Sequence, residues 1–259
     1  MDALKEPDLD AILEFCAAEP IERVFLEDIA RRGLGRFTGL ERDGGLIALC
    51  HVGANLVPSG EDCAAFAPVA AAASAGMLIG EEGAVTDLWQ AARDRMRVPR
   101  EDRPGQPVYV IDEPPEPGGT GLREATLDDL ELLLPVCAIA HEQEIGTNPL
   151  RRDPQGFRWR TRSQIEEGRS WLWTENGSIL FKAEASAWTP HAVQLQQVWV
   201  DPDVRGRGYG QRGMRDLCRR LLELVPAVCL FVRRENTPAI RMYEAIGMRQ
   251  TISYRSLIF

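Results

Sequence analysis

The chain of 259 residues is poor in the side chains that build metal centres and disulfide frameworks. It has six cysteines and three histidines, and no two cysteines form a C-x-x-C pair. His51, His141 and His191 are far apart, so the ligand spacing of a zinc site is missing. We therefore predict no metal. We expect the cysteines, most of them in apolar stretches, to be buried thiols in a reducing cytoplasm.

Long apolar runs and an excess of positive charge are also missing. No stretch is long enough to cross a bilayer and the first residues do not resemble a leader, so we expect a cytoplasmic protein without a membrane partner. Asp and Glu number 39 against 30 Lys and Arg, which gives a formal net charge of −9. This acidic balance disfavours nucleic acid as a partner. A hydrophobic content of 44% is ordinary for a globular protein with one large or two small domains.

A cluster of prolines and glycines at 114–119 breaks any helix or strand and predicts a linker. Before it, the apolar runs 46–52 and 77–80 favour buried strands, and the alanine-rich stretch 63–75 favours a helix. We predict a small N-terminal α/β domain of uncertain role over residues 1–117 and a second domain over residues 118–259.

The most informative segment of the second domain is a strand that runs into a glycine-rich turn and a helix. Val198-Trp199-Val200 is β-branched and aromatic, and a proline ends the strand. Arg205-Gly206-Arg207-Gly208-Tyr209-Gly210 follows, and helical spacing begins at Gln211. A glycine turn that opens a helix presents unpaired N–H groups, which suit phosphate oxygens, although an ordinary tight turn fits the same residues. The arginines that crowd this segment are Arg205, Arg207, Arg212, Arg215, Arg219 and Arg220.

A dinucleotide-binding turn is the more specific alternative, because Gly208 to Gly213 satisfies G-x-G-x-x-G. Its first glycine should stand at the end of the strand, yet Gly208 lies well beyond Val200. The acidic residue expected after the next strand is replaced by Arg233-Arg234. The context therefore disfavours that alternative.

A second segment lies about thirty residues downstream, at spacing that predicts a short helix. Asn236 suits an N-cap and Pro238 suits the first turn. Ala239 and Tyr243 are four residues apart and share a face, and Gly247 fits the position after the helix. A half-buried tyrosine with its hydroxyl at the surface is the ordinary alternative for Tyr243.

The order and spacing of these two segments resemble the GNAT acetyltransferase superfamily, which uses acetyl-coenzyme A. The resemblance implies an α/β (α+β) fold in which helices flank a mixed, mostly antiparallel sheet. If the smaller domain before it descends from a second GNAT unit, that unit has lost the cofactor signature. The resemblance assigns acetyl-CoA binding to Val198, Trp199, Val200, Arg205, Gly206, Arg207, Gly208, Tyr209, Gly210, Gln211, Asn236, Ala239 and Tyr243.

Nearly the whole chain also resembles a mainly actinobacterial family in which an uncharacterised N-terminal domain precedes a GNAT domain. This narrower resemblance implies acetyl-CoA binding and an N-acetyltransferase fold, but it implies no acceptor. The segments that carry it are Gly53–Pro58, Gly105–Val108, Glu142–Gly146, Phe181–Glu184, Gln196–Val200 and Leu257–Phe259.

The resemblance gives Tyr243 the role of protonating the departing thiolate, while the general base is open. Some GNAT enzymes keep a glutamate where Gln194 stands here, and glutamine cannot act as that base. Glu184 on the neighbouring strand is our first candidate, with a structural pairing to Lys182 as the alternative. Glu144 is the second candidate, and a chain of waters is the third possibility.

Trp188 and His191 flank a proline loop beside the expected acceptor-binding opening, and Trp188 is therefore a candidate acceptor contact. The other candidate acceptor contacts are Glu144 and Gln196. The predicted activity is transfer of acetyl from acetyl-CoA to a primary amine of a small molecule or peptide, by a monomer or homodimer. A non-catalytic acyl-CoA sensor is the alternative, since Gln194 replaces the expected base. A pure interaction scaffold is disfavoured because it needs no phosphate site.

Overall fold

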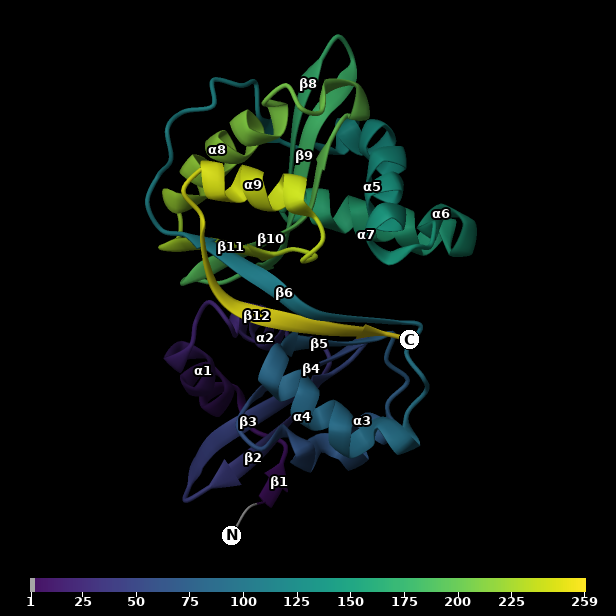
Figure 1. Cartoon of the computed structure of the whole chain (residues 1–259), viewed down its shortest axis with the longest axis vertical. Coiled ribbons are helices and arrows are strands. Elements are labelled where there is room, and N and C mark those ends of the chain that lie inside the picture. The colour runs from purple at the N-terminus through teal and green to yellow at the C-terminus, as the bar shows by residue number, and fades with distance from the viewer. Residues whose placement is uncertain (1–2) are drawn as a thin grey trace.

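The computed structural model describes residues 3–259, and its strands form a single twelve-stranded sheet with helices on both faces (Figure 1). Only the pairs β4–β5 and β10–β11 are parallel. The predicted mixed, mostly antiparallel sheet is therefore confirmed. In the sheet order β1-β2-β3-β4-β5-β12-β6-β11-β10-β9-β8-β7, the strands are β1 (Ala3–Lys5), β2 (Arg36–Arg42), β3 (Gly45–Val52), β4 (Asn55–Gly60), β5 (Met77–Glu81), β12 (Arg249–Ile258), β6 (Glu101–Ile111), β11 (Ala227–Phe231), β10 (Ala192–Val200), β9 (Ser178–Trp188), β8 (Ser170–Glu175) and β7 (Arg123–Glu124).

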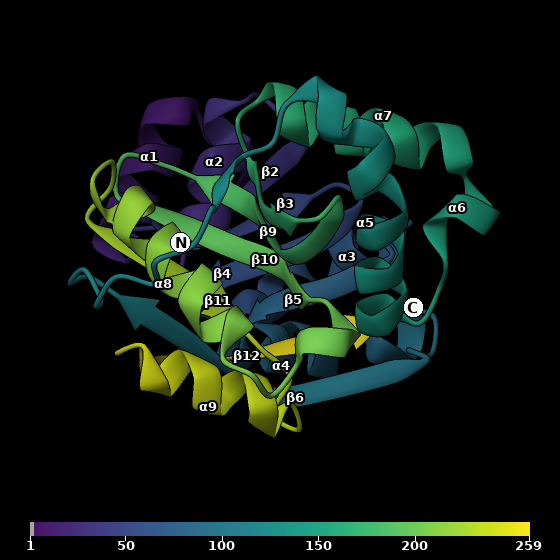
Figure 2. The ribbon, with the colours of Figure 1, turned by 90° about the horizontal axis from the view of Figure 1, so that it is seen from above.

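The helices cover the two faces of each half of the sheet (Figures 1 and 2). In the N-terminal half, α1 and α2 pack on one face and α3 and α4 on the other. In the C-terminal half, α8 and α9 cover one face, and α5 and α7 cover the other. The helices are α1 (Leu9–Ala18), α2 (Val24–Arg31), α3 (Ala67–Ala72), α4 (Glu82–Ala92), α5 (Leu130–Ile145), α6 (Pro149–Arg152), α7 (Pro154–Glu166), α8 (Tyr209–Leu222) and α9 (Thr237–Ala245), with 3₁₀ turns η1 (Cys63–Phe66), η2 (Arg93–Arg95), η3 (Leu127–Asp129) and η4 (Pro202–Val204).

Local sequence signals account for several of these elements. The hairpin between β8 and β9 turns at Asn176 and Gly177, whose φ angles of +50° and +79° fit a tight two-residue turn. Thr126 and Asp129 form a capping box ahead of α5. As predicted, Asn236 caps α9 through its side chain, which accepts a hydrogen bond from Ala239 N at 3.3 Å. Each of these signals depends on only a few neighbouring residues.

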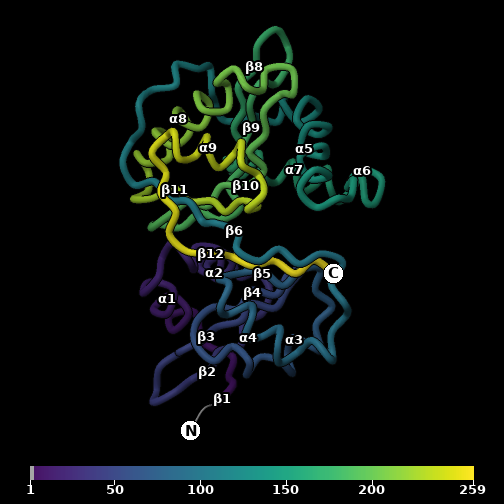
Figure 3. The backbone as a smooth tube through the Cα atoms, in the orientation of Figure 1, coloured from purple at the N-terminus to yellow at the C-terminus, as the bar shows by residue number. Residues whose placement is uncertain are grey.

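Strands β6 and β12 lie at the junction of the two halves and join them (Figure 3). β6 lies within the predicted first domain, yet it is placed between β11 and β12. β12 in turn pairs with β5 of the N-terminal half. The sheet thus runs without a break across the predicted boundary at 117/118, which stays a prediction.

Helix α2 packs against both halves and buries charged groups between them. Val24 shares an apolar cluster with Val110 of β6 and Ala187 of β9. One turn further on, Asp28 accepts hydrogen bonds from both Nη atoms of Arg169, at 2.7 and 3.1 Å, and Asp28 is 2% exposed. A buried bidentate pair of this kind fixes the relative orientation of the groups that carry it.

The N-terminal half also contains a parallel strand pair, in which Asn55 of β4 pairs with Met77 of β5 and Leu56 pairs with Leu78. β4 and β5 stay close, because a Cβ on Gly80 would lie 2.8 Å from Pro58 O. The helical segment after β4 begins at Asp62 and Cys63, and Asp87 already accepts a hydrogen bond from Ala64 N at 2.8 Å. Carboxylates at a helix start disfavour an anion, so this helical segment is not suited to phosphate.

All six cysteines are free and buried, as predicted. Among residues 3–259 no helix is both long and apolar enough to span a membrane. The same part of the chain contains no cluster of three or more His, Cys, Asp or Glu side chains that could hold a metal ion.

Candidate active site

The parallel pair of β10 and β11 opens after three residues. Pairing runs from Ala192 to Gln194 on β10 and from Ala227 to Cys229 on β11, and then it stops. β10 continues to Val200 without a partner on that side. Backbone N–H and C=O groups along this free edge need partners, and an extended ligand can supply them as an added strand would.

A bulge in β10 sets the direction of this free edge. Gln197 and Val198 together oppose one residue of β9, and Gln197 has a φ of +49°. Lys182 Nζ donates a hydrogen bond to Gln197 Oε1 at 3.3 Å. The bulge turns Gln196, Val198 and the neighbouring backbone toward a large cavity.

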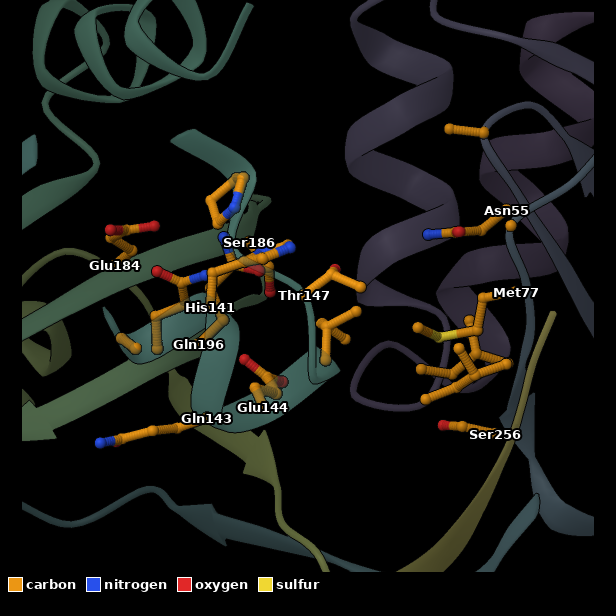
Figure 4. Close-up of a pocket in the computed structure, with 18 of the residues that line it drawn as sticks. Asn55, Met77, His141, Gln143, Glu144, Thr147, Glu184, Ser186, Gln196 and Ser256 are labelled. Carbon is orange, nitrogen blue, oxygen red and sulfur yellow. The ribbon is translucent and has the colours of Figure 1, made fainter. Parts of the chain in front are cut away.

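That cavity has a volume of about 1540 Å³ and lies between the two halves of the molecule (Figure 4). Glu144, Glu184 and Gln196 lie on one side of it, and Asn55 and Met77 lie on the other. Tyr243, Val198, Trp199 and Asn236 also line it. The cavity therefore brings together the predicted acid, both candidate bases and part of the predicted cofactor strand.

The glycine turn lies outside this cavity, at the start of α8. Gly206 and Gly208 have φ angles of +74° and +81°, which favour glycine, and Gly208 caps α8 with no side-chain hydrogen bond. Among the hydrogen bonds of residues 3–259, none uses the N–H of Tyr209, Gly210 or Gln211. Free donors at the positive end of a 14-residue helix are a feature that suits an anion.

The arginines of this segment divide between the turn and the linker. Arg212 donates to the carbonyl oxygens of Gly118 and Gly119, at 2.9 and 2.7 Å, and Arg219 donates to Pro115 O at 2.7 Å. These two arginines hold the linker on α8. Arg205 and Arg207 stay exposed beside the glycine turn, where they can face phosphate.

Tyr243 lies on α9 with its side chain 5% exposed and its ring 6.0 Å from that of Tyr109. Burial, and to a smaller degree the charge of Glu144, raises the pKa of the Tyr243 phenol. The phenol is therefore protonated at neutral pH, as a proton donor must be. Ala239 packs against the same apolar cluster and does not line the cavity.

Glu144 lies in the last turn of α5, where three arginines bind the end of the helix. Arg100 Nη2 donates to Ile145 O and Arg103 Nη2 to Glu144 O, at 2.7 and 2.8 Å. Arg233 also donates to Glu144 O. Guanidinium groups satisfy the free carbonyls and the negative end of the dipole at a helix C-terminus. They fix the backbone of Glu144 and leave its carboxylate without a hydrogen bond to any residue in 3–259.

Burial raises the pKa of the Glu144 carboxyl, even though the positive charges of Arg103 and Arg233 oppose that shift. A carboxylate with a raised pKa accepts a proton more readily than an exposed one. Glu144 lines the same cavity as Tyr243, and its role as a general base stays a prediction.

Glu184 is held in a buried ion pair with Lys182. Lys182 Nζ donates to Glu184 Oε1, and Cys137 Sγ donates to the same oxygen at 3.2 Å. Lys182 is completely buried; burial alone would lower the pKa of its ammonium, but the negative charge of Glu184 raises it overall. Burial also raises the pKa of the Cys137 thiol to about 12, so the thiol stays protonated. The structural pairing considered for Glu184 is present, and its role as a base remains a prediction.

Trp188 and His191 lie away from the cavity lining. Trp188 packs against the core beneath α8, with its ring 5.9 Å from that of Trp171, and His191 is exposed. A register shift between β9 and β10 at Ala185 to Ala187 reverses the side-chain alternation, and so Trp188 joins the face that carries Phe181. Strand periodicity could not predict this reversal. The position gives no support to Trp188 as an acceptor contact, which stays a prediction.

Sequence reasoning missed the contribution of the N-terminal half to this cavity. Asn55, Met77 and Arg100 line it together with residues of the C-terminal half. The segment Gly53–Pro58, which contains Asn55, supports only a family resemblance. No local sequence pattern indicates which strands a distant segment will face.

Comparison with known families agrees with this geometry. Residues 136–248 match the Acetyltransferase (GNAT) family, and residues 35–133 match a domain of unknown function, DUF4081. The chain is similar to the mycothiol acetyltransferase of Mycolicibacterium smegmatis, with 27% identity over 53% of this chain and 50% of that protein. It is 32% identical to the mycothiol acetyltransferase of Nocardioides sp. over 51% of this chain and 50% of that protein. The chain thus spans about half the length of these relatives.

Solved structures resemble nearly the whole chain in fold. A GNAT-family acetyltransferase from Colwellia psychrerythraea has a TM-score of 0.61 at 12% identity, and 99% of each chain is covered. A tandem GNAT protein from the clavulanic acid biosynthesis pathway has a TM-score of 0.57 at 12% identity, over 100% of this chain and 98% of that one. The family models thus place a GNAT acetyltransferase domain over residues 136–248 of the chain, preceded by a DUF4081 domain over residues 35–133.

Proposed function

We propose that the protein transfers an acetyl group from acetyl-CoA to a primary amine of a small molecule or peptide. The observation that carries the proposal is the meeting of three features at one cavity. These are the free edge of β10, the protonated phenol of Tyr243 and the unpaired carboxyl of Glu144. Each one supplies a different requirement of acetyl transfer to an amine.

The residues fit acetyl-CoA as a substrate that brings the acetyl group as a thioester. The uncapped N-terminus of α8, with Arg205 and Arg207 beside it, suits the pyrophosphate. The free backbone of Gln196 to Val200 suits the extended pantetheine arm, and its N–H groups can polarise the thioester carbonyl. Asn236 lines the cavity beside this arm.

Glu144 is the general base that we favour. Its carboxylate takes the proton from the acceptor ammonium, and the neutral amine then attacks the thioester carbonyl. Glu184 is the other candidate, but two donors already occupy its Oε1 atom. A base whose lone pairs are engaged is less available to an incoming ammonium.

Tyr243 supplies the proton that the departing sulfur of CoA needs. As the carbon–sulfur bond breaks, the phenol donates its proton to the departing sulfur, and a solvent proton restores the phenol. The attacking nitrogen loses a second proton to solvent as the tetrahedral intermediate collapses, and the proton that Glu144 accepted also returns to solvent. The products are the amide, free CoA and, after solvent restores the Tyr243 phenol, one released proton. Burial keeps the phenol protonated until the thiolate forms.

Calorimetric titration with acetyl-CoA, with CoA and NAD as controls, tests the first half of the proposal. Thiol release in the presence of a panel of amines tests the second half. Because the matched relatives are mycothiol acetyltransferases, amines related to mycothiol belong in that panel. Binding with amine-dependent thiol release is expected. Binding without turnover on a broad panel favours an acyl-CoA sensor, and no binding of either CoA species refutes the proposal.

A further inference from the structure

The cavity is much larger than a reacting amine and an acetyl group require. Its volume of about 1540 Å³ exceeds the ~300–1,000 Å³ that is usual for small-molecule pockets. Asn55 and Met77 of the N-terminal half, together with Ser256 of β12, form the wall opposite Glu144 in Figure 4. The acceptor side of the site is thus built by both halves of the chain.

The charge of this lining is opposite to that of the protein as a whole. The chain has a formal net charge of −9, yet the cavity is lined by more arginines than acids. The acids are Glu144, Asp153, Glu184 and Glu235, and Lys182 already pairs with Glu184. The arginines are Arg97, Arg100, Arg103, Arg152, Arg160 and Arg233.

Most of these guanidinium groups have no carboxylate partner. Within residues 3–259, Arg103 is the one member of the set that forms a salt bridge, with Glu101 at 2.6 Å. Arg97 donates through Nη2 to Ala75 O and Arg100 through Nη2 to Ile145 O, each at 2.7 Å. A guanidinium has five N–H donors, so a backbone carbonyl fixes each group and leaves most of its donors for a ligand.

We infer that the acceptor amine carries an anionic group, a carboxylate or a phosphate, which the arginines of this cavity bind while the amine faces Glu144. Arg97 and Arg100, which stand just before β6, contribute the binding groups of the N-terminal half. The inference rests on the proposed acetyl transfer, and it gives the N-terminal domain a role in acceptor selection. Planar guanidinium forks match the oxygens of carboxylate and phosphate, and such charge-assisted hydrogen bonds are stronger than neutral ones.

The test uses pairs of amines that differ only in the anion. Glycine and glycinamide form the carboxylate arm, and phosphoethanolamine and ethanolamine form the phosphate arm. Each amine is titrated into the CoA-saturated full-length protein and is also assayed for thiol release from acetyl-CoA. We expect the anionic member of one arm to bind about ten- to a hundredfold more tightly than its neutral partner, the range of one or two charge-assisted hydrogen bonds. The arm that responds identifies the anion.

Two variants assign the effect to the arginines. Arg97→Gln with Arg100→Gln should bring the ratio of anionic to neutral amine binding close to one, and this ratio is the readout because Arg100 also holds the end of α5 beside Glu144. Arg151→Gln is the matched control, because Arg151 precedes Arg152 on α6 but does not line the cavity. Thermal unfolding of each variant confirms that the fold is retained.

Equal binding of both members in both arms, or an equal loss for both members in the double variant, overturns the inference. Anion-selective binding that the double variant abolishes, without acetylation of any amine, supports the anion site and refutes the proposed acetyl transfer. The two ideas can therefore fail separately.

Discussion

Replacing each of the two candidate bases with glutamine should have opposite consequences for stability and for catalysis. Glu184→Gln removes the charge that balances Lys182, whose side chain is 0% exposed. Breaking a buried pair from one side costs about 3–5 kcal/mol. Glutamine keeps one acceptor oxygen for Nζ, so we expect the lower end, about 3 kcal/mol. At about 2–4 °C per kcal/mol for a chain of this size, Tm falls by roughly 6–12 °C.

Glu144→Gln should leave stability almost unchanged, because no hydrogen bond within residues 3–259 uses the Glu144 side chain. We expect a change within about 0.5 kcal/mol. Loss of a general base should instead lower kcat by about 10²–10⁴-fold, with little effect on the affinity for acetyl-CoA.

The assay combines calorimetric unfolding with thiol release from acetyl-CoA at saturating amine. Glu142→Gln is the matched control, since Glu142 stands in the same turn but is exposed and outside the cavity lining. A Glu184→Gln protein that unfolds at the wild-type temperature would contradict a charged, buried Lys182. If Glu144→Gln turns over normally while a stably folded Glu184→Gln protein does not, Glu184 is the base and our choice is wrong.

Three further predictions concern the acid, the pH dependence and the contact between the halves. Tyr243→Phe should lower kcat by about 10²–10⁴-fold and leave the calorimetric Kd for acetyl-CoA near wild type; an unchanged kcat would exclude the phenol as the proton donor. Because Glu144 must be deprotonated, kcat/KM should fall as pH drops through its pKa, which burial raises above that of an exposed glutamate. A plot of kcat/KM against pH should show this decrease, and Glu144→Gln should retain only the decrease that protonation of the amine causes. Asp28→Asn breaks a buried pair and should cost about 3–5 kcal/mol in urea unfolding, whereas Asp94→Asn, at an exposed site, should change stability by less than about 0.5 kcal/mol. Equal midpoints would refute the importance of the pair.

A sequence can predict those parts of a fold that depend on near neighbours. The turn at Asn176-Gly177, the capping box at Thr126 and the caps of α9 each involve a few consecutive residues, and all of them are present. The buried strands at 46–52 and 77–80 also appear, because short apolar runs need burial whatever their partners are.

The remaining features depend on partners distant in the chain. Nothing in the composition of β6 and β12 indicates which strands they pair with. β6 pairs with β11 of the C-terminal half, and β12 pairs with β5 of the N-terminal half. The position of Trp188 depends on a one-residue bulge that reverses the faces of β9. The candidate site was predicted where a family motif covers it, at Tyr243 and the glycine turn. Arg100 and Arg103 carry no motif, and their contacts with the end of α5 at Glu144 and Ile145 depend on the folded sheet.

The pairing of β12 with both β5 and β6 also constrains folding of the chain during its synthesis. β12 is synthesised after both of the strands it joins, so the edge of β5 and one edge of β6 remain open while the ribosome completes the C-terminal half. Open strand edges are templates for pairing with other chains, and a nascent chain of this kind depends on timely completion. Neither half can close its sheet before the other exists. We therefore expect equilibrium unfolding to follow one cooperative transition seen equally by probes in both halves; two separate transitions would show that each half holds together alone.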